Sequence, residues 1–312
     1  MEKKADNCID IIKFICCLMI VGMHIHPLLP DPDTNFFFQE YIFRIGVPFF
    51  FISTGFFFAG MDDTKRKSYI KRLLLIYAAS SILYLPFYIH DGIGKITYYL
   101  LTAYHHLWYL NTLALSLIII FFADKMNPKL KYFLFLLFPV AIFFENYCRL
   151  IGDPSINDLS TFLETSGIDR YLKAIPSVLM GVTLKDKKIK TSVRTDILLF
   201  VILMAADLAE VLFLRSTFGI GVSIDVSFFG WAPAIPLLLF GIKTRSFLTS
   251  SASRTVRKTI DLVYILHILI IMVASGALQL QQIPLYLVTL AISFLLSGMV
   301  VYLMASRKKA KS

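Results

Sequence analysis

Residues 283–304 read IPLYLVTLAISFLLSGMVVYLM and hold no charged side chain in 22 positions. A run of about 20 apolar residues is long enough to span the hydrocarbon core of a bilayer as an α-helix. Similar runs recur along the whole chain, and a soluble fold cannot bury so many helices that are apolar on every side. The sequence therefore predicts an all-α, polytopic membrane helical bundle.

The apolar runs predict about ten transmembrane helices, which we expect to form a single transmembrane domain over residues 1–312. Their approximate bounds are residues 9–29, 36–60, 69–90, 97–122, 131–147, 170–184, 196–214, 225–242, 260–280 and 283–304. The first run lacks a small-residue cleavage site, so we interpret it as a helix and not as a signal peptide. The connections are short except for a polar loop from Cys148 to Asp169.

The charge of the chain is distributed unevenly between the loops. The 312 residues are 57% apolar and 17% charged, with 31 Lys+Arg against 21 Asp+Glu and a net charge of +10. Alternate loops and the two termini hold 24 of the basic residues, whereas the other loops hold 5. Cytoplasmic loops carry the excess of Lys and Arg, so both termini are predicted to be cytoplasmic. The positive charge is thus an orientation signal, and we expect no nucleic-acid partner.

The four cysteines show no spacing typical of metal ligands or of a disulfide framework. Cys16 and Cys17 fall inside the first apolar run, where we expect them to pack as small core residues. We expect no metal site and no tightly bound cofactor.

Ionisable side chains within a bilayer are costly, so each one is a candidate functional residue. In the first helix Lys13 and His24 are eleven residues apart, about 16 Å along the axis and on nearly the same face. His26 is expected at the membrane interface. The other candidates inside apolar segments are Asp10, Arg44, His106, Trp108, Asp207, Glu210, Asp261, Tyr264 and His267.

The orientation predicts the depth of these groups. We expect His24, Arg44 and His106 to gather around an outer-to-middle cavity, with Lys13 and His267 nearer the cytoplasm. Two alternatives stay open. Arg44 could form a structural ion pair with Asp207 or Glu210, and these two acids could instead have a proton or substrate role.

Five motifs follow one another along nearly the whole chain. They are Asp10-Ile-Ile-Lys13 with His24 after ten further residues, FRIGVPFFFISTGFFF at 43–58, HLWYL at 106–110, IPSVLMGVTL at 175–184 and VYILH at 263–267. Together they resemble the acyltransferase 3 family of integral membrane acyltransferases, and most closely the membrane part of membrane-bound serine racemases. Lys13 stands where the family usually has Arg, which keeps the charge but loses the bidentate fork. Thr54-Gly55 stands in place of Ser-Gly.

The resemblance implies transfer of an acyl group, usually acetyl, from cytosolic acyl-CoA to a hydroxyl. The acceptor would be a cell-envelope glycan, a glycolipid or a small molecule. The resemblance implies that His24 is the base, that Arg44 binds the oxyanion or the acceptor, and that Lys13 belongs to the same catalytic group. Substrate- or donor-binding candidates are Asp10, Lys71, Arg72, His106, Trp108, Glu210, Tyr264 and His267. Lys71 and Arg72, with Lys65 and Arg66, would hold the CoA phosphates, although most basic loop residues are topology signals.

Two other functions remain open. A transporter of a small polar solute such as serine would also need charges inside the membrane, although no half-to-half repeat is evident. A channel or scaffold is a weaker interpretation. The racemase part is absent from these residues, so we expect no racemisation. We expect the protein to lie in the cytoplasmic membrane of a bacterium.

Overall fold

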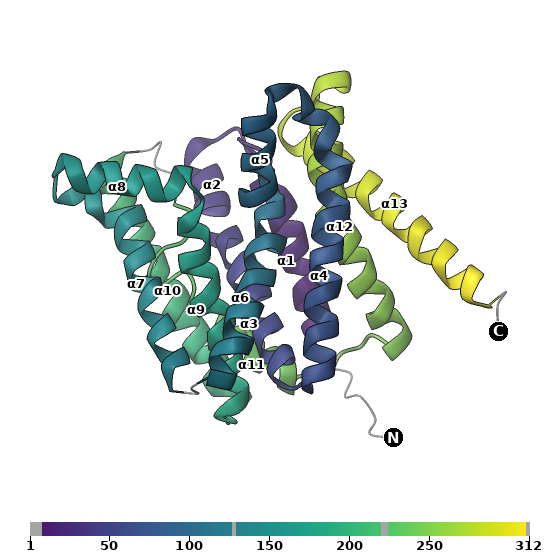
Figure 1. Ribbon diagram of the computed structural model, residues 1–312, viewed down its shortest axis with the longest axis horizontal. Coiled ribbons are helices and arrows are strands. Elements are labelled where there is room, and N and C mark those ends of the chain that lie inside the picture. Colours follow the sequence, from purple (N-terminus) through teal and green to yellow (C-terminus); the bar gives the residue numbers. More distant parts are fainter. Residues whose placement is uncertain (1–7, 127–128, 220–223, 310–312) are drawn as a thin grey trace. The chain divides into compact units, whose positions relative to one another are not determined.

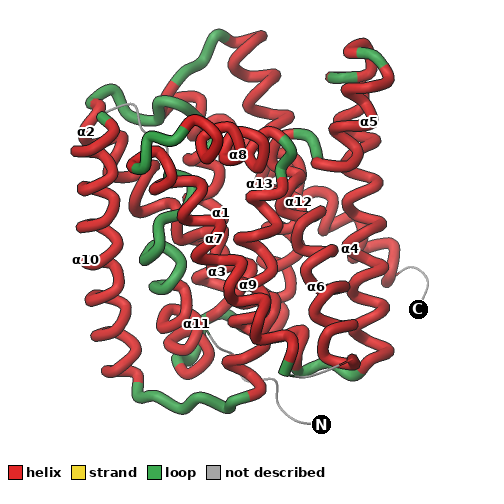
Figure 2. The backbone as a smooth tube through the Cα atoms, turned by 60° about the vertical axis from the view of Figure 1, so that its left-hand side comes forward, coloured by secondary structure: helices red, strands yellow, loops and turns green. Residues whose placement is uncertain are grey.

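The computed structural model describes residues 8–126, 129–219 and 224–309. Every regular element in these ranges is a helix, as predicted (Figure 1), and short loops join them (Figure 2). Within these ranges seven helical stretches are long and apolar enough to cross a membrane, which confirms a multi-pass membrane protein. They are Pro32–Ala59, Asp63–Phe87, His105–Lys125, Lys131–Leu150, Val193–Phe218, Ser251–Leu278 and Gln282–Met304.

Each of the ten predicted segments corresponds to a helix. The three beyond the seven spans are α1 (Ile9–Met23), α9 (Ile168–Asp186) and α11 (Ala234–Lys243). α1 has 15 residues and α11 has 10, fewer than the ~20 that a straight span needs. The count of ten membrane crossings and the cytoplasmic termini therefore stay predictions.

The other α-helices follow in chain order. They are α2 (Pro32–Phe36), α3 (Gly46–Ala59), α4 (Asp63–Tyr84), α5 (Ile93–Thr102), α6 (Trp108–Met126), α7 (Leu137–Ile142), α8 (Pro154–Thr165), α10 (Val193–Phe218), α12 (Ser250–Leu278) and α13 (Gln282–Lys309). Between α2 and α3 lie a π-helical turn, η1 (Phe37–Tyr41), and a 3₁₀ turn, η2 (Ile42–Ile45). A second π-helical turn, η7 (Phe143–Tyr147), follows α7.

Two sequence predictions about these segments need correction. The segment 97–122 is not one helix, because Ala103 and His105 adopt positive φ angles of 73° and 44° that separate α5 from α6. The loop 148–169 is not wholly irregular, because α8 lies inside it. Asp153 accepts from the backbone N–H of Ser155 at 2.8 Å and Pro154 occupies the first turn, and both features favour a helix start.

The chain forms two compact units. The first contains the described residues of Met1–Phe49, Thr191–Val211 and Ala232–Ser312. The second contains those of Phe50–Lys190 and Leu212–Trp231. His24, Arg44 and His267 belong to the first unit, whereas His106 and Trp108 belong to the second.

The first unit is built around α1. Its buried side includes Cys16 and Cys17, as the packing interpretation predicts. α12, α13 and α11 pack against it. At Gly241 of α11, an added Cβ would lie 2.7 Å from the Ile12 side chain, so the small residue allows α11 to approach α1 closely. These contacts with α11, α12 and α13 fix the position of α1, and therefore of the turn that follows it, within the unit.

In the second unit α3 and α9 cross in backbone contact. A Cβ added at Gly55 would lie 2.0 Å from the carbonyl oxygen of Val178, and one at Gly181 would lie 1.9 Å from that of Ile52. Only residues without a side chain permit such an approach. Gly55 belongs to the Phe-rich motif at 43–58 and Gly181 to the IPSVLMGVTL motif at 175–184. Each motif therefore provides one of the two glycines that let α3 and α9 approach closely.

Candidate functional site

Two histidines that are far apart in the sequence meet in the first unit. His24 directly follows the last residue of α1, and His267 is the eighteenth residue of α12, where it is fully buried. Their ring centroids lie 5.1 Å apart, and the ring of Tyr264 lies 6.0 Å from that of His267. Three of the predicted site residues therefore lie together.

His267 lies beside His24, whereas the sequence analysis grouped it with Lys13. The predicted segment began at residue 260, but α12 begins at Ser250, where the side chain of Thr249 accepts from the backbone N–H of Ala252. The added turns carry Arg254, Arg257 and Lys258 and are helical without being apolar, so hydropathy did not reveal them. His267 meets His24 where α12 packs against α1.

The hydrogen bonds of His267 determine which ring nitrogen carries the proton. Nδ1 lies 3.1 Å from the carbonyl oxygen of Val263 and 2.8 Å from that of Tyr264. A carbonyl oxygen can only accept, so Nδ1 must be the donor. In the neutral imidazole the lone pair is then on Nε2. Such a ring can accept a proton from a hydroxyl or from a neighbouring imidazole.

Arg44 has a carboxylate partner that the sequence analysis did not single out. Its Nη2 lies 2.5 Å from Oε2 of Glu40, one turn earlier, and both side chains are only 12% exposed. An ion pair with so little exposure keeps the guanidinium in one place. Glu40 was not selected as a candidate, because it lies in a π-helical turn and such a turn leaves no recognisable pattern in the sequence.

The two acids proposed as partners of Arg44 lie on α10 in the same unit. Asp207 and Glu210 are both buried, at 3% and 7% exposed. Tyr41 of η1 donates its hydroxyl to the carbonyl oxygen of Met204 at 2.8 Å, which fastens η1 to α10. The buried acids thus belong to an element that the Arg44 segment contacts directly.

Lys13 and Asp10 lie in a network of charges at the start of α1. Oδ2 of Asp10 is 3.5 Å from Nε of Arg257 on α12. Lys13 interacts electrostatically with Asp10, Asp261 and Arg257. Since Lys13 is about 16 Å from His24 along the helix axis, the two side chains cannot act on the same reacting atom by direct contact. A catalytic role for Lys13 stays a prediction, as does a substrate-binding role for Asp10.

His106 and Trp108 belong to the second unit. His106 is 2% exposed, and the Tyr84 ring packs edge-on against it at 5.3 Å. The guanidinium of Arg170 lies 5.8 Å from the centre of the Trp108 ring. His105, just before this motif, adopts a left-handed backbone conformation that is costly for a side-chain-bearing residue and is often found at functional sites. Grouping of His106 with His24 and Arg44 stays a prediction.

The basic cluster expected to hold the CoA phosphates divides into two kinds of residue. Lys71 and Arg72 are exposed on α4. Arg66 instead donates to the carbonyl oxygens of Phe58 and Ala59, the last turn of α3, at 3.2 and 2.8 Å.

Lys65 is also engaged. It donates to Asp62 from its side chain at 2.5 Å and from its backbone N–H at 2.9 Å, which caps α4. These hydrogen bonds hold the pKa of the Asp62 carboxyl below its usual range. The donor-binding role of Lys71 and Arg72 stays a prediction.

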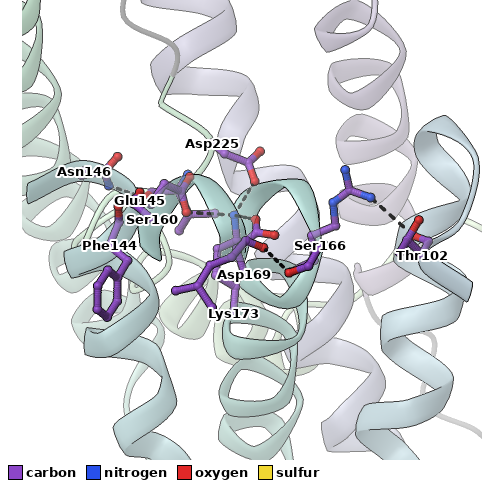
Figure 3. A network of polar contacts seen from close by, with 12 residues as sticks. Thr102, Phe144, Glu145, Asn146, Ser160, Ser166, Asp169, Lys173 and Asp225 are labelled. Atoms are coloured by element: carbon purple, nitrogen blue, oxygen red, sulfur yellow. Dashed lines mark hydrogen bonds and ion pairs between the residues drawn. The ribbon is translucent and has the colours of Figure 1, made fainter. Parts of the chain in front are cut away.

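A buried charge cluster around Lys173 was missed by the sequence analysis (Figure 3). Nζ of Lys173 lies 2.9 Å from Glu145, 3.2 Å from Asp169 and 2.7 Å from Asp225. The lysine side chain is 7% exposed. None of the four side chains was selected as a candidate; the i, i+4 spacing of Asp169 and Lys173 on one helix was the available signal. The cluster ties α9 to η7 and to the segment after residue 223.

We predict that Lys173→Met strongly destabilises the second unit. It would leave three carboxylates without their shared cation, a loss of about 2–4 kcal/mol given that Asp225 is 43% exposed and partly screened by water. Thermal unfolding in detergent measures the effect, with the exposed Lys95→Met as the matched control. Equal melting temperatures for the two variants would contradict a stabilising role of the cluster.

Among the described residues no group of three or more His, Cys, Asp or Glu is arranged to hold a metal ion.

The family model described as an acyltransferase domain matches residues 6–303. The chain belongs to the acyltransferase 3 family. This membership confirms the resemblance seen in the motifs, and the His24–His267 pair joins the first of those motifs to the last.

Two similar proteins carry the name amino-acid racemase, both from Enterococcus faecalis. One is 30% identical over 169 residues and the other 24% identical over 185 residues. The matches cover 49% and 52% of this chain but only 24% and 26% of the relatives. The chain thus matches about a quarter of the length of each relative. No solved structure matches the chain.

Proposed function

We propose that this membrane protein is an O-acyltransferase, and specifically an O-acetyltransferase. It would take the acyl group from cytosolic acyl-CoA and pass it to a hydroxyl of a cell-envelope glycan, a glycolipid or a small molecule. The observation that carries the proposal is the contact between His24 and His267, because a buried imidazole with a fixed tautomer suits proton transfer from an alcohol. Membership of the acyltransferase 3 family supports acyl transfer as the reaction class.

In the proposed reaction His24 accepts the proton of the acceptor hydroxyl. The hydroxyl oxygen forms a bond to the thioester carbonyl carbon, and the carbonyl oxygen becomes an oxyanion. Arg44, held by Glu40, is our candidate for stabilising that negative charge. When the intermediate collapses, the carbon–sulfur bond breaks, and the CoA thiolate takes up the proton from the imidazolium. His267, adjacent to His24, supports the change of protonation state.

The donor would reach the site from the cytoplasm. Lys71 and Arg72 are exposed cations suited to the phosphates of CoA. Asp10, Glu210, His106, Trp108 and Tyr264 stay candidates for substrate binding. We place the protein in a bacterial cytoplasmic membrane with both termini inside, since the loop charges favour that orientation.

The direct test uses the purified protein in liposomes with acetyl-labelled acetyl-CoA. Transfer of the label to a sugar, a glycolipid or a small alcohol, or slow release of labelled acetate without an acceptor, is the expected result. The same liposomes are then tested for counterflow of serine. Serine uptake without acyl transfer or thioester hydrolysis would overturn the proposal and favour a transporter.

We predict that His267→Phe lowers kcat about 100-fold while the KM for acetyl-CoA changes little. Phenylalanine fills a similar volume but cannot accept or hold a proton, and one acid–base group contributes a factor of this size. Initial rates over a range of acetyl-CoA concentrations separate the two constants. An unchanged kcat would remove His267 from the reaction.

A further inference from the structure

Gln39 of η1 fastens the backbone on both sides of His24. The side chain is 1% exposed, and its Nε2 donates to the carbonyl oxygen of Gly22 at 2.8 Å and to that of Ile25 at 2.7 Å. Gly22 lies in the last turn of α1 and Ile25 lies two residues beyond its end. The Gly22 carbonyl also accepts a longer hydrogen bond from the backbone N–H of Ile25, at 3.4 Å. One amide group thus satisfies a carbonyl two residues before His24 and another one residue after it.

A second amide holds the chain that follows. Oδ1 of Asn35 accepts from the backbone N–H groups of Leu28 and Leu29, each at 2.9 Å. Phe43 of η2 also packs on the end of α1, because a Cβ at Gly22 would lie 2.7 Å from its ring. The stretch from α2 to η2 therefore encloses the turn that carries His24.

The two side-chain amides use opposite hydrogen-bonding groups. Gln39 is used as a donor toward carbonyl oxygens, whereas Asn35 is used as an acceptor from N–H groups. This difference matters because the isosteric change from amide to carboxylate removes donors and keeps acceptors. The same chemical substitution should therefore break one contact and preserve the other.

We propose that Gln39 is the positioning residue for His24. Gln39 fixes the turn after α1 so that the His24 ring meets the His267 ring. The next residue of the same π-helical turn, Glu40, forms the ion pair with Arg44. π-helical turns occur frequently at functional sites. The role in turnover rests on the proposed acyl transfer, whereas the role in placing the His24 ring does not depend on it.

The test compares Gln39→Glu with Asn35→Asp in the full chain. In Gln39→Glu the ionised carboxyl repels both carbonyl oxygens, and the protonated carboxyl can donate to only one of them, so the two-point contact that holds the turn is lost. We expect kcat for acetyl-CoA turnover to fall about 10- to 100-fold with little change in the KM for acetyl-CoA, since a displacement of about 1 Å costs that much. Asn35→Asp keeps an acceptor in the same place, and we expect turnover close to that of the unchanged protein.

A second measurement is independent of turnover. Carbethoxylation of His24 by diethyl pyrocarbonate, followed by peptide mass spectrometry, reports how accessible and basic the ring is. The exposed His90 of the second unit is the internal reference. We expect Gln39→Glu to change the rate at His24 but not at His90, and Asn35→Asp to change neither.

The outcomes separate the two proposals. Unchanged reactivity of His24 in Gln39→Glu, or an equal effect of Asn35→Asp, would overturn the positioning role even if acyl transfer is found. A changed reactivity of His24 in a protein without any acetyl-CoA turnover would support the positioning role and count against the proposed function. Size-exclusion profiles and melting temperatures of both variants show whether an effect is global unfolding, which would also overturn a local role.

Discussion

Replacement of His24 by alanine is expected to lower acyl transfer by about 10²–10⁴-fold while the protein still inserts into the membrane. The size of the loss is that of a general base removed from a reaction in which the nucleophile is a neutral alcohol. The side chain follows the last turn of α1 and is not part of its buried face, so the fold should survive. Transfer of label from acetyl-CoA in liposomes measures the effect.

His26→Ala is the matched control for this variant. It removes the same side chain two residues later, where the ring is exposed and takes no part in the contact with His267 described above. Full activity of His26→Ala beside inactive His24→Ala is the expected result. Retained activity in His24→Ala would exclude His24 as the base, and the proposed mechanism with it.

The second large effect is expected at the crossing of α3 and α9. An alanine at position 181 would place its Cβ 1.9 Å from the carbonyl oxygen of Ile52 and 2.6 Å from the backbone nitrogen of Phe56. Backbone atoms cannot rotate away as a side chain can, so the helices must separate. We expect a loss of about 3 kcal/mol or more, a large part of the stability of a typical protein.

Gly276→Ala provides the comparison for Gly181→Ala. Gly276 also lies inside a helix, α12, but a Cβ there would meet nothing within 4 Å. Alanine favours the helix over glycine by about 1 kcal/mol, so this variant should be as stable as the parent or more so. Thermal unfolding in detergent distinguishes the two. Equal melting temperatures for both variants would show that α3 and α9 can move apart at little cost.

The sequence predicted the class of the molecule well, because membrane helices are specified by long apolar runs that need no tertiary information. All ten predicted segments contain a helix, and the motifs indicated the family correctly. The limits of the helices were less predictable. The polar turns that begin α12 and the amphipathic helix α8 are stabilised by caps and packing, and hydropathy does not report either.

The candidate site was only partly predictable from the sequence, because it too depends on packing between helices. His24, Tyr264 and His267 were each selected as candidates, but their meeting depends on how α12 packs against α1. Glu40, Gln39 and Lys173 were not selected. Their roles come from contacts between segments and from turns that leave no periodic pattern, so only the folded chain reveals them.

The π-helical turn η1 has a further consequence for which deletions this chain can accept. Such a turn accommodates one residue more than an α-helical turn of the same rise. Deletion of one residue other than Gln39 within Phe37–Tyr41 would give an α-helical turn that leaves the flanking segments in nearly their present orientation but rotates the residues inside the turn. Gln39 lies inside the turn, so its side chain would rotate relative to Arg44, and the two side chains could not both face their present partners. The number of residues in this turn, as much as their identity, is what relates the end of α1 to the arginine.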